Sequence, residues 1–192
     1  MLLKGIKIGF ALTGSFQMFE CVIDKIRELI EEGAEVIPIM SYSAYTFNTK
    51  YGKAESFRSK IESLTGRKII HTIQEAENIW HDKLIDIMTI APCSGNTISK
   101  LAKGITDTPV TVATKYSLIN ENSIVIAVSS NDGLSTNAEN IGKLLNSKNI
   151  YFVPFRQPNP ITKPNYIAFD KNYIIDTILK ALNKEQIQPL LL

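Results

Sequence analysis

The chain has 192 residues, of which 44% are hydrophobic and 21% charged, and its formal net charge is +2; these values are typical of one soluble globular domain. Basic residues are scattered among acidic ones, so no nucleic-acid surface is predicted, and no apolar run approaches the roughly 20 residues that a membrane span needs. The two cysteines, Cys21 and Cys93, lack zinc, redox or disulfide-framework spacing, and the first residues lack a signal peptide's features, so we expect a cytoplasmic protein without a metal site.

The first forty residues predict a βαβ unit. A short apolar strand is expected at Lys7–Leu12, and apolar residues at helical spacing predict a helix at Phe16–Glu32 that ends at Gly33. A second strand is expected at Ala34–Met40. A strand, a helix and a further strand in succession favour a parallel sheet.

Alternating strands and helices are predicted for the rest of the chain. The polar and aromatic stretch Ser41–Gly52 is long for a connection and is a candidate binding loop. The elements expected after it are helices at Ala54–Leu64, Gln74–Trp80, Ser94–Lys103, Thr108–Leu118, Thr136–Leu145 and Asp170–Leu182, and strands at Lys68–Thr72, from Leu84 to Pro92, at Ser123–Val128 and, last, at Ile150–Phe155. A proline-dense loop precedes the last helix. We therefore predict a single α/β domain over residues 1–192, a three-layer Rossmann-like or flavodoxin-like parallel sheet flanked by helices.

The strongest local signal is the stretch Leu84–Thr97. An apolar run reaches Pro92, where the missing N–H should end the strand ladder, and small hydroxyl and amide residues then open a helix. Open α/β sheets bind ligands at such strand-to-helix turns, where free N–H groups can receive an anion or a ring carbonyl. The alternative is a helix N-cap that serves only to end the strand.

A second turn of this kind follows the first strand. Gly14 would let the backbone approach a phosphate closely, and Ser15 would open a helix whose dipole favours negative charge. The turn is neither a dinucleotide fingerprint nor a P-loop, and it suits a mononucleotide phosphate, although a tight connection is the alternative. In a parallel sheet, four polar segments would share one edge: Thr13–Ser15, Ser41, Pro92–Thr97 and Ser129–Asp132.

These two turns carry a family resemblance. Gly9–Ser15 and Ala91–Asp107 resemble the signatures of the FMN-binding flavoprotein family that includes cysteine decarboxylases, with Cys93 and Gly95 in place of the usual alanines. The resemblance implies an FMN with its phosphate at the first turn and its ring at the second. The residues it implicates in cofactor binding are Thr13, Gly14, Ser15, Phe16, Ser41, Pro92, Cys93, Ser94, Asn96, Thr97 and Ser129.

The chain departs from the cysteine decarboxylases at two motifs. Asn78 lies near the position of their histidine, and His71 and His81 are out of register. Their Pro-x-Met-Asn stretch is matched at Asn131, but Ser130 stands where methionine is expected. Decarboxylation of a peptidyl cysteine is therefore disfavoured.

The second half resembles a narrower branch of the family, the B subunits of two-component synthases of pyridine-2,6-dicarboxylate (dipicolinate). The segments that carry this likeness include Ser129–Asp132, Ser147–Phe155 and Lys163–Asn165. The resemblance implies oxidative formation of the dicarboxylate in the mother cell of a sporulating bacterium, with a partner A subunit that binds NADP. Two alternatives remain open, a flavin-binding or scaffolding subunit whose partner holds the active site and, less favoured, an FMN-dependent decarboxylase.

Substrate and subunit contacts are predicted with fewer signals. Asn131 and Arg156 are candidates for binding the dicarboxylate, and Arg156 is preferred over Lys50, Lys100 and Lys115 because it follows a strand. Asn131 and Cys93 are the candidates for catalysis. A homo-oligomer is expected, and its contacts or those of the partner subunit are assigned to Tyr42–Gly52 and to the tail at residues 185–192.

Overall fold

The computed structural model describes residues 1–81 and 84–192 and contains, within them, one mixed β-sheet of seven strands. Five parallel strands lie side by side in the order β2 (Glu35–Met40), β1 (Lys7–Leu12), β3 (Ile87–Cys93), β4 (Ser123–Ser130) and β5 (Ile150–Phe152). This order is that of the flavodoxin-like fold, so the predicted fold class is confirmed. The carboxyl ends of these strands share one edge, which brings the predicted polar turns together.

Strand β4 is forked at its carboxyl end. Its first half pairs with β5, whereas Ser129 and Ser130 pair antiparallel with β7 (Ile167–Phe169), which in turn pairs with β6 (Phe155–Arg156). The antiparallel extension therefore borders the polar turn after β4.

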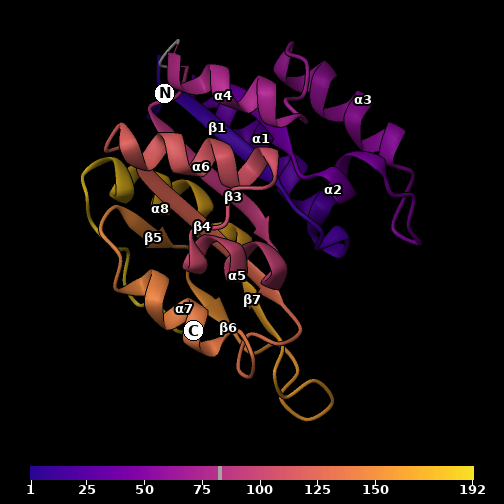
Figure 1. The fold of residues 1–192 in the computed structure, drawn as a ribbon, viewed down its shortest axis with the longest axis vertical. Coiled ribbons are helices and arrows are strands. Elements are labelled where there is room, and N and C mark those ends of the chain that lie inside the picture. Colours follow the sequence, from indigo (N-terminus) through magenta and orange to yellow (C-terminus); the bar gives the residue numbers. More distant parts are fainter. Residues whose placement is uncertain (82–83) are drawn as a thin grey trace.

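Helices cover both faces of the sheet (Figure 1). One face carries α1 (Phe19–Glu31), α3 (Ala54–Thr65) and α8 (Ile174–Leu182), whose apolar residues form one core cluster with the sheet. The other face carries α4 (Ile73–His81), α5 (Gly95–Lys103), α6 (Pro109–Ile119) and α7 (Ala138–Leu145), which build the second cluster. The short helix α2 (Tyr42–Thr46) follows β2. No helix within the described ranges is long and apolar enough to cross a bilayer.

Local sequence signals account for several helix boundaries. Gly33 and Gly104 adopt left-handed conformations (φ +90° and +69°) just after α1 and α5, as glycine does at helix C-termini. Pro109 opens α6 behind Thr108, whose side chain accepts a hydrogen bond from the N–H of Thr111 in a capping box. The helix ends predicted at Gly33 and Lys103 and the helix start predicted at Thr108 are therefore confirmed.

Six element predictions are wrong in detail. The expected loop Ser41–Gly52 contains α2, and the expected strand Lys68–Thr72 is reduced to one bridge between Ile70 and Ile39. The first helix begins as a 3₁₀ turn, η1 (Phe16–Met18), and a second such turn, η2 (Lys171–Tyr173), precedes α8.

The other two errors concern strand ends. Strand β3 does not stop at Pro92, because its pairing with β4 resumes at Cys93 after an irregularity. The strand expected at Ile150–Phe155 is divided into β5 and β6 and is not the last, because β7 follows it within the proline-dense region.

Candidate functional site

Thr13 joins the two polar turns that sequence analysis singled out. Its Oγ1 donates to the main-chain oxygen of Pro92 at 2.8 Å and accepts from the N–H of Ser94 at 2.8 Å. The side chain is buried, so these hydrogen bonds are shielded from water. Thr13 therefore fixes the end of β1 against the turn that opens α5.

Ser15 joins the first turn to the end of β4. Its Oγ donates to the main-chain oxygen of Ser129 at 2.7 Å, and both residues are buried. The Oγ of Ser129 is itself buried and has no hydrogen-bond partner among the described residues. A buried hydroxyl without a partner carries a desolvation cost of about 1–3 kcal/mol, which a bound polar group would relieve.

The first turn leaves its backbone open to a ligand. Gly14 is exposed, and a Cβ built on it would meet only the Oγ of Ser43, at 3.5 Å. Ser41 caps α2 by accepting from the N–H of Ala44 at 3.3 Å, and its Oγ lies 3.3 Å from that of Ser43. Two hydroxyl groups thus lie beside Gly14. Phe16, the remaining predicted contact of this turn, opens η1 and is partly buried.

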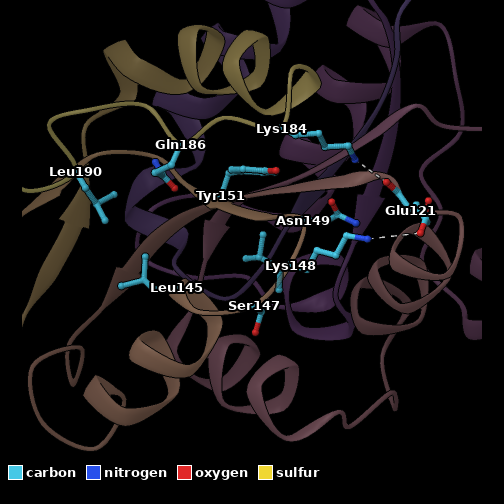
Figure 2. A pocket seen from close by; sticks show the side chains of 10 residues that line it. Glu121, Leu145, Ser147, Lys148, Asn149, Tyr151, Lys184, Gln186 and Leu190 are labelled. Carbon is cyan, nitrogen blue, oxygen red and sulfur yellow. Dashed lines mark hydrogen bonds and ion pairs between the residues drawn. The ribbon is translucent and has the colours of Figure 1, made fainter.

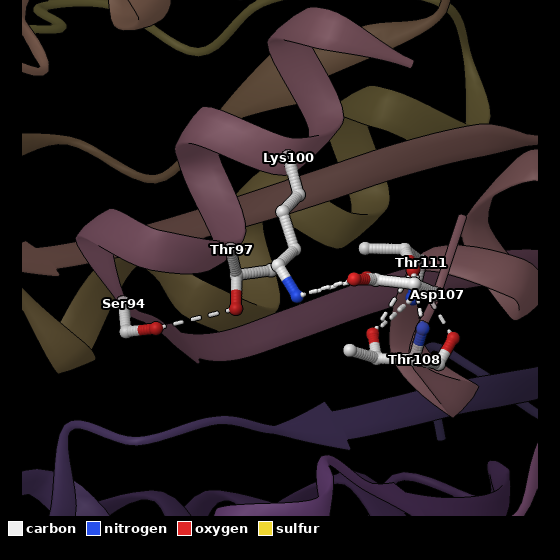
Figure 3. A network of polar contacts seen from close by, with 6 residues as sticks. All are labelled: Ser94, Thr97, Lys100, Asp107, Thr108 and Thr111. Carbon is white, nitrogen blue, oxygen red and sulfur yellow. Dashed lines mark hydrogen bonds and ion pairs between the residues drawn. The ribbon is translucent and has the colours of Figure 1, made fainter. Parts of the chain in front are cut away.

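The second turn begins α5. Ser94 is the N-cap residue, yet its Oγ contacts the Oγ1 of Thr97 at 3.2 Å and caps no main-chain N–H (Figure 3). Asn96 is exposed. The turn is therefore polar at its surface and is not a helix cap made through the serine side chain.

Lys100, a less preferred candidate for substrate binding, is engaged in an ion pair. Its Nζ lies 2.8 Å and 2.9 Å from the two carboxylate oxygens of Asp107 (Figure 3). This pair ties α5 to the segment that precedes α6.

Cys93 does not point towards the polar turns. Its side chain is fully buried in the second core cluster, whereas Ala91 belongs to the first. Residues two apart in a regular strand share a face, so the irregularity between Ile90 and Cys93 moves the thiol to the other side. Burial raises the pKa of the thiol far above its ordinary value. The thiol is therefore packed in the apolar core and is protonated at neutral pH, and its contact with a flavin stays a prediction.

A polar network that sequence analysis missed lies behind the start of α5. The carboxylate of Asp132 accepts from the Oγ of Ser130 and, at 2.9 Å, from the Nδ2 of Asn137. Asn140 donates to Asn137 at 2.9 Å and to Ser99 at 3.1 Å. The hydrogen bond from Ser130, together with that from Asn137, lowers the pKa of Asp132, so the carboxylate is ionised at neutral pH.

Gly95 makes room for this network. A Cβ at this position would lie 2.6 Å from the Oδ1 of Asp132 and 2.7 Å from the Nδ2 of Asn137, and closer still to the Oγ of Ser130. Gly95 and Ser130 are both departures from the family signatures, and they meet in space. That coincidence was the available sequence signal for the network.

The remaining predicted residues lie around this edge or away from it. Asn131 is exposed on the turn after β4. Arg156 is exposed on β6 and is in register with Ala168, which pairs with Ser129, so the three form one row across the sheet. His71 stacks on Tyr45 with ring centroids 3.8 Å apart. The side chain of His81 lies outside the described part of the structure.

Comparison with known proteins identifies the family. The Flavoprotein family profile matches residues 2–182, and the chain belongs to this family. It is 42% identical over 189 residues to the dipicolinate synthase B subunit of Bacillus subtilis (strain 168), covering 98% of this chain and 94% of that protein.

Solved structures agree with this assignment. The dipicolinate synthase B subunit from Bacillus halodurans superposes with a TM-score of 0.92 at 38% identity, over 100% of this chain and 98% of the other. The FMN-dependent cysteine decarboxylase SpaF gives a TM-score of 0.69 at 19% identity, over 95% and 98% of the two chains, which shows a shared fold.

Proposed function

We propose that the edge formed by the turns after β1, β2, β3 and β4 binds FMN. The unpartnered hydroxyl of Ser129 is the observation that carries this proposal, because it is a buried polar atom beside the two turns that the family signatures mark. Gly14 offers open backbone next to the hydroxyls of Ser41 and Ser43, which suits a phosphate. Ser94, Asn96 and Thr97 offer the hydrogen-bonding groups that a flavin ring needs.

The proposed role of the chain is that of a B subunit in a two-component dipicolinate synthase. The support is the similarity over nearly the whole chain to proteins of that name. A bound flavin would supply two-electron oxidation chemistry for the formation of the aromatic dicarboxylate. The chain's own residues would orient the substrate, with Asn131 and Arg156 as the proposed contacts, and the A subunit is the proposed carrier of NADP. The proposal places this enzyme in the mother cell during sporulation.

One observation favours a second candidate function, a flavin-binding subunit without an acid or base of its own. Of the described titratable groups near the edge, Asp132 has a lowered pKa and the thiol of Cys93 a strongly raised one. Neither group is suited to exchange protons near neutral pH. In this alternative the partner supplies the acid–base chemistry.

Titration with FMN tests the cofactor proposal. The purified protein should bind FMN with a change in flavin fluorescence and a visible flavin spectrum. Gly14→Val should weaken FMN binding at least about tenfold, or ~1.4 kcal/mol, because branched carbons then cover the open backbone. Gly142→Ala, on α7 with no atom within 4 Å of the new Cβ, is the matched control and should bind FMN normally. A wild-type protein that shows no flavin absorbance after incubation with FMN and removal of the unbound FMN by gel filtration would exclude the proposal.

An omission assay separates the two candidate functions. Dipicolinate formation from a dihydrodipicolinate-pathway intermediate is followed with this chain, the A subunit, FMN and NADP, and each of these four components is left out in turn. If the A subunit alone reaches the full rate, this chain has no catalytic share. Loss of activity in Asn131→Ala, with FMN binding and subunit assembly intact, would support a shared active site.

A further inference from the structure

A large cavity lies at the opposite edge of the sheet from the proposed cofactor site. It has a volume of about 770 Å³ and is lined by residues just before β4, at the start of β5 and after α8 (Figure 2). In open α/β sheets, small ligands bind at the carboxyl ends of the strands, whereas this cavity faces the amino ends. A docking role for another chain therefore fits this position better than a second small-molecule site.

The free edge of β5 opens into this cavity. The N–H of Ile124 donates to Asn149 at 2.8 Å, and the N–H of Val153 donates to Ile126 at 2.9 Å. Because peptide groups alternate along a strand, those of Ile150 and Phe152 point away from β4.

The C-terminal segment covers most of this edge. The side-chain amide of Gln186 stands in for a neighbouring strand, accepting from the N–H of Phe152 at 2.8 Å and donating to its oxygen at 2.7 Å. Farther along, the N–H of Phe155 donates to Leu190 at 3.0 Å and its oxygen accepts from Leu192 at 3.1 Å.

Ile150 is where this cover stops. Its outward N–H and C=O have no hydrogen-bond partner in residues 1–81 and 84–192, and the residue lines the cavity. An uncovered edge of this kind is a template for the backbone of an extended segment.

The rim of the cavity defines the chemistry of its occupant. Lys148 has a side chain that is 82% exposed and lies 3.7 Å from the carboxylate of Glu121, and the Nζ of Lys184 donates to the main-chain oxygen of Glu121 at 2.6 Å. Leu145 is 40% exposed beside them. The two ammonium groups of the lining outnumber its one carboxylate, that of Glu121, so the rim has a net positive charge beside an apolar floor. This favours a segment that carries an acidic side chain next to an apolar one.

The rim is also held in a defined shape. Glu121, Asn149 and Lys184 are the non-glycine residues with positive φ in the described part of the chain (59°, 64° and 61°), and all three line this cavity. Glu121 and Lys184 follow the last turns of α6 and α8, and Asn149 directs the chain into β5. Left-handed residues are common just after helices, and these three set the course of the chain around the cavity.

We propose that this cavity docks an extended acidic and apolar segment of the partner A subunit, which adds to β5 at Ile150. The identity of the partner rests on the proposed function, whereas the kind of segment rests on the free strand edge and the lysines. The site lies away from the FMN edge, so both can be occupied together.

Affinity measurements on the complex of the full chains test this proposal. Leu145→Asp and Lys148→Glu should each weaken binding of the A subunit at least tenfold by calorimetry. The matched controls are two surface changes outside the cavity, Ile161→Asp, at a residue that is 90% exposed, and Lys143→Glu, at an exposed residue of α7. The affinity of each control for the A subunit should stay within twofold of the wild-type affinity. FMN binding should be unchanged in all four variants. Hydrogen exchange at the N–H of Ile150 should slow in the complex.

Four outcomes would overturn the docking proposal. Equal affinities for cavity and control variants would place the partner elsewhere, as would unchanged exchange at Ile150. If this chain alone forms a dimer and Leu145→Asp abolishes that dimer, the occupant of the cavity is a second copy of this chain. If the wild type binds FMN but no A subunit, the docking proposal fails and the cofactor proposal stands. If it binds the A subunit but no FMN, the cofactor proposal fails and the docking proposal stands.

Discussion

At the scale of single residues, Gly95 couples the start of α5 to the turn after β4. Its missing Cβ is what allows Ser130, Asp132 and Asn137 to pack against the helix, and the Oδ1 of Asp132 and the Nδ2 of Asn137 lie 2.6 Å and 2.7 Å from the Cβ position. We expect Gly95→Ala to destabilise the protein by about 1–3 kcal/mol, because polar atoms fixed by their own hydrogen bonds cannot move aside at low cost. Urea unfolding measures the difference.

A second glycine provides the control for this prediction. Gly142 lies within α7 with no atom within 4 Å of an added Cβ, so Gly142→Ala should stabilise the protein by about 0.5–1 kcal/mol. Combining Gly95→Ala with Asp132→Ala should cost less than the sum of the single changes, since the clash and the network are then removed together. Strictly additive effects would contradict the coupling.

Asp132 should make stability depend on pH in the acid range. The hydrogen bond from Ser130, with that from Asn137, lowers the pKa of Asp132 in the folded state. A lowered folded pKa gives stability that is complete above the unfolded value of about 3.9 and is lost as the pH falls through the folded pKa. The stability difference between the wild type and Asp132→Asn should therefore be largest near neutral pH and shrink below about pH 4. A difference that stays constant down to low pH would show that the charge has no part in it.

At the scale of elements, the edge of β5 depends on a side chain. Gln186 makes two hydrogen bonds to the main chain of Phe152, at 2.8 Å and 2.7 Å, in place of a strand. Gln186→Ala should destabilise the protein by about 1–2 kcal/mol and speed exchange of the Phe152 N–H. Gln74→Ala, at an exposed residue of α4, should leave both unchanged. If the Phe152 N–H of Gln186→Ala exchanges at the wild-type rate, then the Gln186 amide does not protect this N–H better than water does.

The elements that sequence analysis predicted well are those with regular periodicity and clear end signals. The helix of the βαβ unit, which ends just before Gly33, and the helix that begins at Pro109 are examples. Strand β7 was missed because its three residues follow a proline-dense loop. They form a strand only because Ser129, Ser130 and β6 pair with them in antiparallel fashion. Non-local pairing of this kind leaves no periodic pattern in so short a segment.

The candidate site was predicted unevenly for a similar reason. The turns at Thr13–Ser15 and Ser94–Thr97 lie together as expected, because parallel strands end at one edge. The direction of the Cys93 side chain was not predictable from alternation, since an irregularity in β3 reverses it. The Asp132 network depends on contacts between α5 and the turn after β4, which no local pattern encodes.

At the scale of the whole molecule, cofactor binding should appear as added stability. A ligand that binds only the folded state at 100 times its dissociation constant stabilises it by about 2.7 kcal/mol. FMN should therefore raise the unfolding midpoint of the wild type, and the shift should be reduced in Gly14→Val, whose backbone is covered. Riboflavin, which lacks the phosphate, should give a smaller shift at equal concentration, because the turn at Gly14 and the hydroxyls of Ser41 and Ser43 then have no partner. Equal shifts with riboflavin and FMN would mean that the first turn is only a tight connection between β1 and α1.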